Sequence, residues 1–179
     1  MAAQLYDRLH AAVDRTLYRI FGRREVDHDD LVQNTFEQIV LTLARNRFAG
    51  ACSLTTWACT VASHVGLNAL RSRRRERRVF DRTEELEGDE GGGAAMSGAV
   101  STDRTVQARQ ELERVRGHLA EMDAVKAHTL VLHDMLGHDL AEIAVLTGAT
   151  VAAAQSRLVR GRRDLMARLE ADRTRGGSR

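Results

Sequence analysis

The sequence predicts an all-helical protein made of two small domains. The chain has 179 residues, no proline and only 4% aromatic residues, a composition that favours helices over sheets. Apolar residues recur at intervals of three and four in both halves, which is the spacing of amphipathic helices. Residues 88–102 are rich in glycine and small polar side chains with almost nothing to bury, so a flexible linker is expected there. The expected division is a helical domain over residues 1–80, an acidic and glycine-rich linker over 81–104, a four-helix domain over 105–172 and a disordered tail over 173–179.

Three helices are expected in the first domain. Gly22 and the charged residues 23–27 separate the first helix from the second, and Ser53 is a plausible N-cap for the third. Each helix has an apolar stripe that can pack on the others. The three stripes are Leu5, Leu9, Val13, Leu17 and Ile20; Val32, Phe36, Ile39 and Leu43; and Leu54, Ala58, Val61 and Val65.

Charge is segregated along the chain, although the formal net charge is only +2. Residues 71–82, at the end of the third predicted helix, carry seven arginines against two acids, whereas residues 84–90 carry five acids and no base. A charge run of this kind is usually a solvated face. Six arginines within residues 71–78 nevertheless repel one another unless a polyanion lies nearby, which favours nucleic acid as a partner.

The second domain is expected to end in a helix-turn-helix motif, after two helices at about residues 106–119 and 124–135. Asp139 and Glu142 have the spacing of a capping box at a helix start. Gly148 stands where a left-handed residue would end that short helix. The apolar positions of the short helix are Leu140, Ile143, Ala144 and Thr147.

The second helix of the motif has one apolar and one polar, basic face. Thr150 can cap it, and Ser156, Arg160 and Arg163 lie opposite its apolar stripe. Such a helix can pack on its own domain and still offer hydroxyl and guanidinium groups to a DNA major groove. An ordinary helical hairpin with a solvated arginine face is the alternative. The apolar stripe is Val151, Ala154, Leu158, Gly161, Leu165 and Leu169.

Two blocks of the chain resemble the extracytoplasmic-function (ECF) group of bacterial sigma-70 factors, in the right order. The first consists of residues 29–36 (DDLVQNTF), Trp57 and residues 68–71 (NALR) before the arginine run. The second consists of residues 142–144 (EIA) and 156–162 (SRLVRGR). The resemblance implies an initiation factor that binds core RNA polymerase, recognises the minus 35 and minus 10 promoter elements and helps to melt the duplex.

The resemblance also implies partners and contact residues. Core polymerase would be bound through its beta-prime clamp helices and beta flap, and an anti-sigma factor is an expected further partner. Packing of Phe36 in the domain core is an alternative to its contact with polymerase. The residues implied for polymerase binding are Asp30, Leu31, Gln33, Asn34, Phe36 and Glu37.

The third predicted helix and the loop before it would bind the minus 10 element, where unstacked bases are captured from one strand by pockets and positive charge. Trp57 lies at helical spacing, so it can equally be a core residue. The implied minus 10 residues are Arg47, Phe48, Trp57, Asn68, Arg71, Arg73, Arg74 and Arg75.

The last helix would read the minus 35 element, but its start departs from the family pattern. Relatives usually have Gly-Thr-Val-Lys where this chain has residues 152–155 (AAAQ), which removes one hydroxyl and one positive charge from the DNA face. Weaker affinity or an unusual sequence preference is expected. The implied minus 35 residues are Thr150, Ala153, Gln155, Ser156, Arg157, Arg160, Arg162 and Arg163.

Other classes of site are not indicated. Cys52 and Cys59 lack the spacing of a zinc site or a disulfide framework, and His128, His133 and His138 would scatter around a helix rather than share a metal. No catalytic motif, cofactor motif, signal peptide or membrane-spanning stretch is present, so a cytoplasmic protein that is not an enzyme and needs no cofactor is expected. The rival functions are a stand-alone helix-turn-helix repressor or activator, and a helical module that sequesters another protein.

Overall fold

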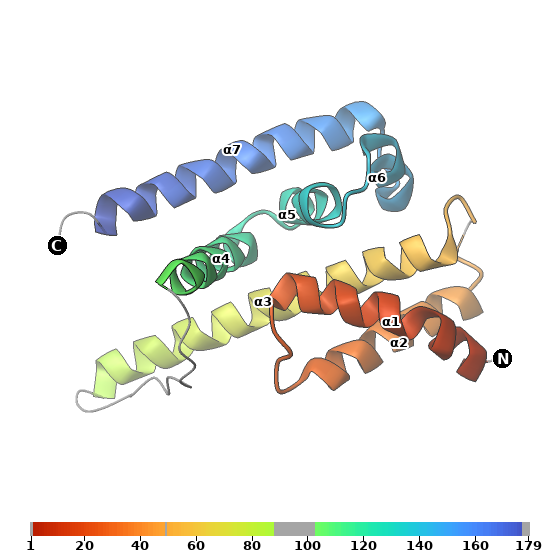
Figure 1. Cartoon of the computed structure of the whole chain (residues 1–179), viewed down its shortest axis with the longest axis horizontal. Coiled ribbons are helices and arrows are strands. Elements are labelled where there is room, and N and C mark those ends of the chain that lie inside the picture. The colour runs from red at the N-terminus through yellow and green to blue at the C-terminus, as the bar shows by residue number, and fades with distance from the viewer. Residues whose placement is uncertain (1, 49, 88–102, 177–179) are drawn as a thin grey trace.

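All regular structure in the described part of the chain is helical, which confirms the predicted fold class. The structure, a computed structural model, describes residues 2–48, 50–87 and 103–176. The first half of the chain forms three helices, and the second half forms four helices with a π-helical turn after the second (Figure 1). The elements are α1 (Ala2–Phe21), α2 (His28–Ala44), α3 (Leu54–Glu87), α4 (Asp103–Glu121), α5 (Ala124–Leu130), η1 (Val131–Met135), α6 (Leu140–Thr147) and α7 (Val151–Gly176).

The first half packs α1 and α2 on the N-terminal part of α3, as the predicted stripes require. Leu9, Val13 and Leu17 of α1 are completely buried, and so is Ile39 of α2. Gly22 ends α1 with a φ of +71°, a left-handed conformation that suits glycine. Ser53 caps α3, because its Oγ accepts a hydrogen bond from the backbone N–H of Thr56 at 3.0 Å.

The second half packs α4, α5 and α6 along α7. Ala154 and Leu158 of α7 are buried as predicted. Val151 is not part of this core, since 48% of it is exposed. It is the first residue of α7, so the right periodicity alone did not place it in the core.

The two halves share one hydrophobic core. Leu119 and Met122, at and just after the end of α4, are almost fully buried and belong to the same cluster as Val13 and Ile39. Figure 1 shows α4 and α5 next to the long helix α3, on the side away from α2. The predicted division into two helical blocks therefore describes two sets of helices that are packed together.

Two helices extend beyond the predicted boundaries of the linker and tail. α3 continues through Glu87 instead of ending near residue 80, because residues 83–87 (TEELE) contain no helix breaker before Gly88. α7 continues to Gly176 instead of ending at residue 172. Most of the predicted linker, residues 88–102, and the end of the tail, residues 177–179, lie outside the described residues.

Candidate nucleic-acid and polymerase interfaces

The helix-turn-helix is built by local caps that the sequence predicted. The Asp139 side chain accepts a hydrogen bond from the backbone N–H of Glu142 at 2.8 Å, and the Glu142 side chain accepts one from the backbone N–H of Asp139 at 3.1 Å. Gly148 ends α6 with a φ of +62°. Thr150 Oγ1 then accepts a hydrogen bond from the backbone N–H of Ala153 at 3.1 Å at the start of α7. These caps set the direction of α7 away from α6.

The face of α7 that points away from the core carries the predicted minus 35 residues. Ala154, on the opposite face, packs with Leu132 and Ile143 beneath the motif. The polar face is therefore free of the packing that holds the helix in place. Thr150, Gln155, Arg160, Arg162 and Arg163 are exposed, and Ala153, Ser156 and Arg157 are half-buried.

Arg162 differs from the other arginines on this face because its guanidinium is held by the protein itself. Its Nε donates a hydrogen bond to Asp134 Oδ2 at 3.0 Å, and its Nη2 donates to Asp134 Oδ1. The hydrogen bond from Arg162 outweighs burial and holds the pKa of Asp134 below its usual range. Within the described residues, Arg160 and Arg163 have no such acidic partner. Arg162 thus ties α7 to η1, which sequence reasoning did not anticipate.

The arginine run on α3 is also partly neutralised by acids of the chain. Arg73 pairs with Asp27 and Glu25 in the loop between α1 and α2, and its guanidinium lies 4.7 Å from the centre of the Phe21 ring. Arg74 and Arg78 both pair with Glu121 at the end of α4. The expectation that these arginines lack counter-charges was therefore too simple. Their acidic partners are far away in sequence and are brought near only by the packed fold.

Arg71, Asn68 and Arg75 complete the predicted minus 10 set on α3. Arg71 is half-buried, and this burial holds its pKa below the usual range although Asp123 is close by. It donates a hydrogen bond to Asn68 Oδ1 at 3.3 Å. Arg75 is exposed and has no ion pair within the described residues. Asn68 and Arg75 line a groove that is also lined by His128 of the second half.

The loop before α3 places two aromatic rings together. The rings of Phe48 and Trp57 lie 5.1 Å apart between centres, and both side chains are half-buried. Trp57 packs at the edge of the core and also lines the groove that contains Asn68. It is neither a fully buried core residue nor a freely exposed stacking platform. Arg47 is exposed next to this pair.

The predicted polymerase-binding residues on α2 divide into two groups. Leu31 and Phe36 turn inward, with 8% and 9% of each residue exposed. The Phe36 ring packs 4.6 Å from the Tyr6 ring of α1. Both side chains belong to the core cluster, Phe36 as part of the predicted apolar stripe, and Phe36 also lines a groove between α1 and α2. The residues of the set that are exposed are Asp30, Gln33, Asn34 and Glu37.

A shallow groove between α1 and α2 adjoins the exposed α2 residues. Tyr6, Val40 and Leu41 line it, and each is between 43% and 48% exposed. Gln33 and Glu37 stand at its border, where Gln33 Nε2 donates a hydrogen bond to Glu37 Oε1 at 3.2 Å. Apolar side chains bordered by polar ones are typical of a surface that binds a protein.

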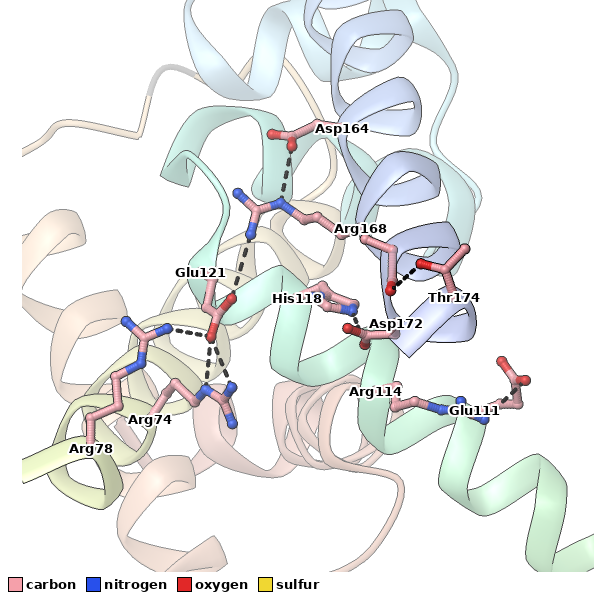
Figure 2. A network of polar contacts seen from close by, with 11 residues as sticks. Arg74, Arg78, Glu111, Arg114, His118, Glu121, Asp164, Arg168, Asp172 and Thr174 are labelled. Carbon is pink, nitrogen blue, oxygen red and sulfur yellow. Dashed lines mark hydrogen bonds and ion pairs between the residues drawn. The ribbon is translucent and has the colours of Figure 1, made fainter. Parts of the chain in front are cut away.

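Sequence reasoning missed a network of polar contacts that joins α3, α4 and α7 (Figure 2). Glu121 accepts hydrogen bonds from Arg74, Arg78 and Arg168. No local pattern could have indicated it, because Glu121 is more than 40 residues from each of these partners.

Neither a metal site nor a membrane helix is found among the described residues. In residues 2–48, 50–87 and 103–176, no three His, Cys, Asp or Glu side chains are grouped as metal ligands. Over the same ranges, no helix has both the length and the apolar composition needed to span a bilayer.

Comparison with known proteins gives a family match for each half of the chain. Residues 5–76 match the family "Sigma-70 region 2", and residues 112–165 match "Sigma-70, region 4". RNA polymerase sigma factor CnrH of Cupriavidus metallidurans is 34% identical over 160 residues, which cover 86% of this chain and 79% of that protein. ECF RNA polymerase sigma factor SigC of Mycobacterium tuberculosis is 28% identical over 144 residues, covering 80% and 71%. The solved structure of CnrH in complex with the cytosolic domain of CnrY is similar with a TM-score of 0.53 and 25% identity, over 96% of this chain and 88% of that one.

Proposed function

Since the chain belongs to the ECF group of the sigma-70 family of RNA polymerase sigma factors, we propose that its two halves divide the work of promoter recognition. The protein binds core RNA polymerase, directs it to promoters and promotes melting of the duplex. In this proposal residues 1–80 bind polymerase and the minus 10 element, and residues 105–172 bind the minus 35 element.

The main support for minus 35 recognition is the outer face of α7. Arg160 and Arg163 are exposed there, while Ala154 and Leu158 hold the opposite face in the core. A helix held in this way can enter a major groove, where guanidinium groups contact phosphates and guanine edges. Arg162 contributes by fixing α7 against η1 through Asp134, and it is a positioning residue rather than a primary DNA contact.

The exposed α2 residues and the groove beside them form the proposed polymerase surface. Gln33, Asn34 and Glu37 supply polar groups, and Tyr6 with Leu41 supplies apolar area next to them. A polar rim around partly exposed apolar side chains suits a helical partner such as the beta-prime clamp helices. Phe36 stabilises the floor of this groove through its contact with Tyr6.

The proposed minus 10 surface consists of the Phe48–Trp57 aromatic pair and the polar face of α3. Unstacked bases can pack on half-buried aromatic rings, and arginines next to the rings can hold the backbone. Asn68 and Arg75 are the exposed members of this face in the groove that also contains Trp57.

The remaining roles follow from this assignment. The protein catalyses no reaction itself, since the polymerase supplies the chemistry, and it acts in the cytoplasm together with that polymerase. A protein partner that blocks these surfaces, an anti-sigma factor, is a further expected component. The complex between CnrH and the cytosolic domain of CnrY supports the idea that factors of this type are bound by another protein.

The test is run-off transcription from a genomic promoter library by core RNA polymerase, with and without the protein. New transcripts whose start sites share upstream motifs are expected only when the protein is present. Arg160→Ala should reduce these transcripts, whereas Arg19→Ala, which removes an exposed arginine from α1, should leave them unchanged. Tight binding to duplex DNA with no polymerase association would favour a stand-alone repressor or activator. Binding to neither would favour a protein-sequestering module.

A further inference from the structure

A single carboxylate joins the two halves of the protein at the C-terminal end of α4. Glu121 Oε1 accepts hydrogen bonds from Arg74 Nε at 3.0 Å and from Arg78 Nη2 at 2.6 Å, both on α3. Its Oε2 accepts one from Arg168 Nη1 of α7 at 3.4 Å. Figure 2 shows these guanidinium groups converging on Glu121 from both sides. We refer to Glu121 with Arg74, Arg78 and Arg168 as the Glu121 cluster.

The Glu121 carboxylate is partly shielded from water and stays ionised. Only 18% of its side chain is exposed. Burial raises its pKa, but the hydrogen bond from Arg74 and the positive charges of Arg74 and Arg78 outweigh burial and hold the pKa below the usual range. Hydrogen bonds between charged groups in such a setting are stronger than exposed ion pairs.

Other contacts between the halves cover the same side of α3. Ser63 Oγ lies 2.8 Å from His128 Nε2 of α5. Arg71 is half-buried there, close to Asp123. Asn68 and Arg75 line a groove together with His128 and Leu146 of the second half. The part of α3 that carries the proposed minus 10 residues is thus the part against which the second half packs.

We propose that the Glu121 carboxylate takes, in the free protein, the place that a DNA backbone phosphate takes on the arginines of α3 during promoter binding. A carboxylate and a phosphate present similar oxygen pairs to a guanidinium group, so they compete for the same donors. The second half of the chain is therefore an internal competitor of single-stranded DNA. The inference rests on the proposed assignment of α3 to the minus 10 element.

The division of the α3 arginines into paired and unpaired groups is consistent with this competition. Arg73, Arg74 and Arg78 are occupied by acids of the chain, whereas Arg75 and Arg77 have no ion pair within the described residues. The free protein therefore offers DNA only part of the positive charge in its arginine run. Release of Glu121 would free two more guanidinium groups on the same helix.

The test compares the full-length variants Glu121→Gln and Glu111→Gln with the unchanged protein. Both substitutions remove one negative charge from α4, but among the described residues Glu111 forms an ion pair only with Arg114 of its own helix. The first readout is small-angle X-ray scattering without any ligand, which reports whether the halves separate. The second is fluorescence anisotropy with a labelled oligothymidylate strand over a series of salt concentrations, without polymerase.

We expect Glu121→Gln to leave the radius of gyration unchanged, because Leu119 and Met122 still hold the two halves in one core. Its affinity for the strand should rise by roughly three- to tenfold, because two arginines are released. The dependence of log affinity on log salt should become steeper by about 0.7 for each additional phosphate contacted. Glu111→Gln should leave the radius unchanged and alter affinity by less than about twofold. Glu121→Asp, which keeps the charge, should bind DNA more weakly than Glu121→Gln.

Equal gains for Glu121→Gln and Glu111→Gln would overturn the proposal, since bulk charge would then explain the effect. An unchanged affinity for the strand in Glu121→Gln would overturn it as well. Circular dichroism checks that each variant is folded. If Glu121→Gln is unfolded, Glu121→Ser, which also removes the carboxylate, must raise the affinity for the strand for the proposal to stand. The binding measurement contains no polymerase, so failure of run-off transcription by the unchanged protein would overturn the proposed function separately.

Discussion

Three exposed arginines near the middle of α7 differ in whether an acidic side chain of the protein binds their guanidinium group. Arg160 and Arg163 have no acidic partner in the described part of the chain, whereas Arg162 is bound by two hydrogen bonds to Asp134. A free guanidinium can bind a phosphate at no cost to the protein, but a paired one must first leave its carboxylate. Exposure alone therefore does not rank residues of this face by their contribution to DNA binding.

Arg160→Ala and Arg162→Ala should consequently have different effects. We expect Arg160→Ala to weaken promoter binding by the polymerase complex and to lower its salt slope by about 1, the loss of one phosphate contact. Arg162→Ala should mainly lower the melting temperature, because it breaks the tie between α7 and η1. Filter binding over a salt series and thermal melting measure the two effects. Equal losses of DNA affinity in both variants would contradict the distinction.

Gly22 combines a left-handed backbone with a close neighbour. Its φ is +71°, and an added Cβ would come within 2.1 Å of Arg116 Nη2. Arg116 is held there because its Nε donates a hydrogen bond to the Ile20 carbonyl at 2.8 Å. Gly22→Ala should therefore suffer both backbone strain and displacement of a guanidinium that links α4 to α1.

Gly148 supplies the matched control for Gly22. It has a φ of +62°, but an added Cβ would meet nothing within 4 Å. Gly148→Ala should lower the free energy of unfolding by about 1 kcal/mol, the cost of the left-handed conformation alone. Gly22→Ala should cost more, by roughly 1 kcal/mol or above, because it also breaks the buried Arg116 contact. Urea denaturation of both variants measures the difference, and equal costs would show that the Arg116 contact contributes nothing.

His128 makes stability depend on pH in a defined range. Burial first, and then the nearby positive charges of His64 and Arg71, lower its pKa to about 4 from an ordinary value of 6.5. The ring is therefore neutral in the folded protein at neutral pH, close to Ser63 Oγ. On unfolding, the same ring regains a pKa near 6.5 and takes up a proton as soon as the pH falls below that value.

The contribution of His128 to the free energy of unfolding is fully present above pH 6.5 and is lost as the pH falls from about 6.5 to 4. The loss is at most about 3 kcal/mol, since each pKa unit corresponds to 1.36 kcal/mol. In His128→Gln, the free energy of unfolding measured in urea should change less between pH 7 and pH 4.5 than in the unchanged protein. A variant with the same pH dependence as the unchanged protein would exclude His128 as the cause.

At the scale of single helices, features fixed by local spacing were predictable. The capping box at Asp139, the left-handed Gly148 and the Thr150 cap each depend on residues within four positions, and all three are present. The apolar stripes were also predictable because their periodicity is local. Val151 was the exception, since the right periodicity alone did not place it in the core.

Features that depend on contacts between helices could not be read from the sequence. The acids that neutralise Arg73 and Arg74 lie 46 and 47 residues away, and no short motif connects them. The same is true of Arg162, which looks like a free DNA contact until η1 brings Asp134 beside it. Leu31 and Phe36 match the family motif and are almost fully buried in the free protein, which the motif alone could not indicate.

The N-terminal turns of α7 depart from the pattern of the sigma-factor family, and the effect of this departure can be tested. Gln155 is exposed on the proposed DNA face, at the position where similar proteins usually have a lysine. Gln155→Lys should strengthen binding of the polymerase complex to its minus 35 element and steepen the salt slope by about 0.9, one additional phosphate contact. Gln4→Lys adds the same charge at an exposed site near the start of α1 and should change neither. An equal gain from both lysines would mean that net charge alone is responsible.

At the scale of the whole molecule, the continuous core has a thermodynamic consequence. Leu119 and Met122 of the second half belong to the same buried cluster as Val13 and Ile39 of the first. Two domains connected only by a linker would unfold independently, whereas halves that share a core lose stability together. The free protein is therefore expected to unfold in one cooperative transition with equal calorimetric and van't Hoff enthalpies.

Substitutions in each half make this expectation specific. Ile39→Ala, in the first half, and Ile143→Ala, beneath the helix-turn-helix, remove completely buried side chains and should each cost about 2 to 5 kcal/mol. In a cooperative molecule both substitutions lower the midpoint of the same calorimetric transition. Met122→Ala removes a contact between the halves and should broaden the transition or split it in two. Two resolved transitions in the unchanged protein, each shifted by only one of the isoleucine substitutions, would show that the halves are independent. The Glu121 cluster would then act without the support of a shared core.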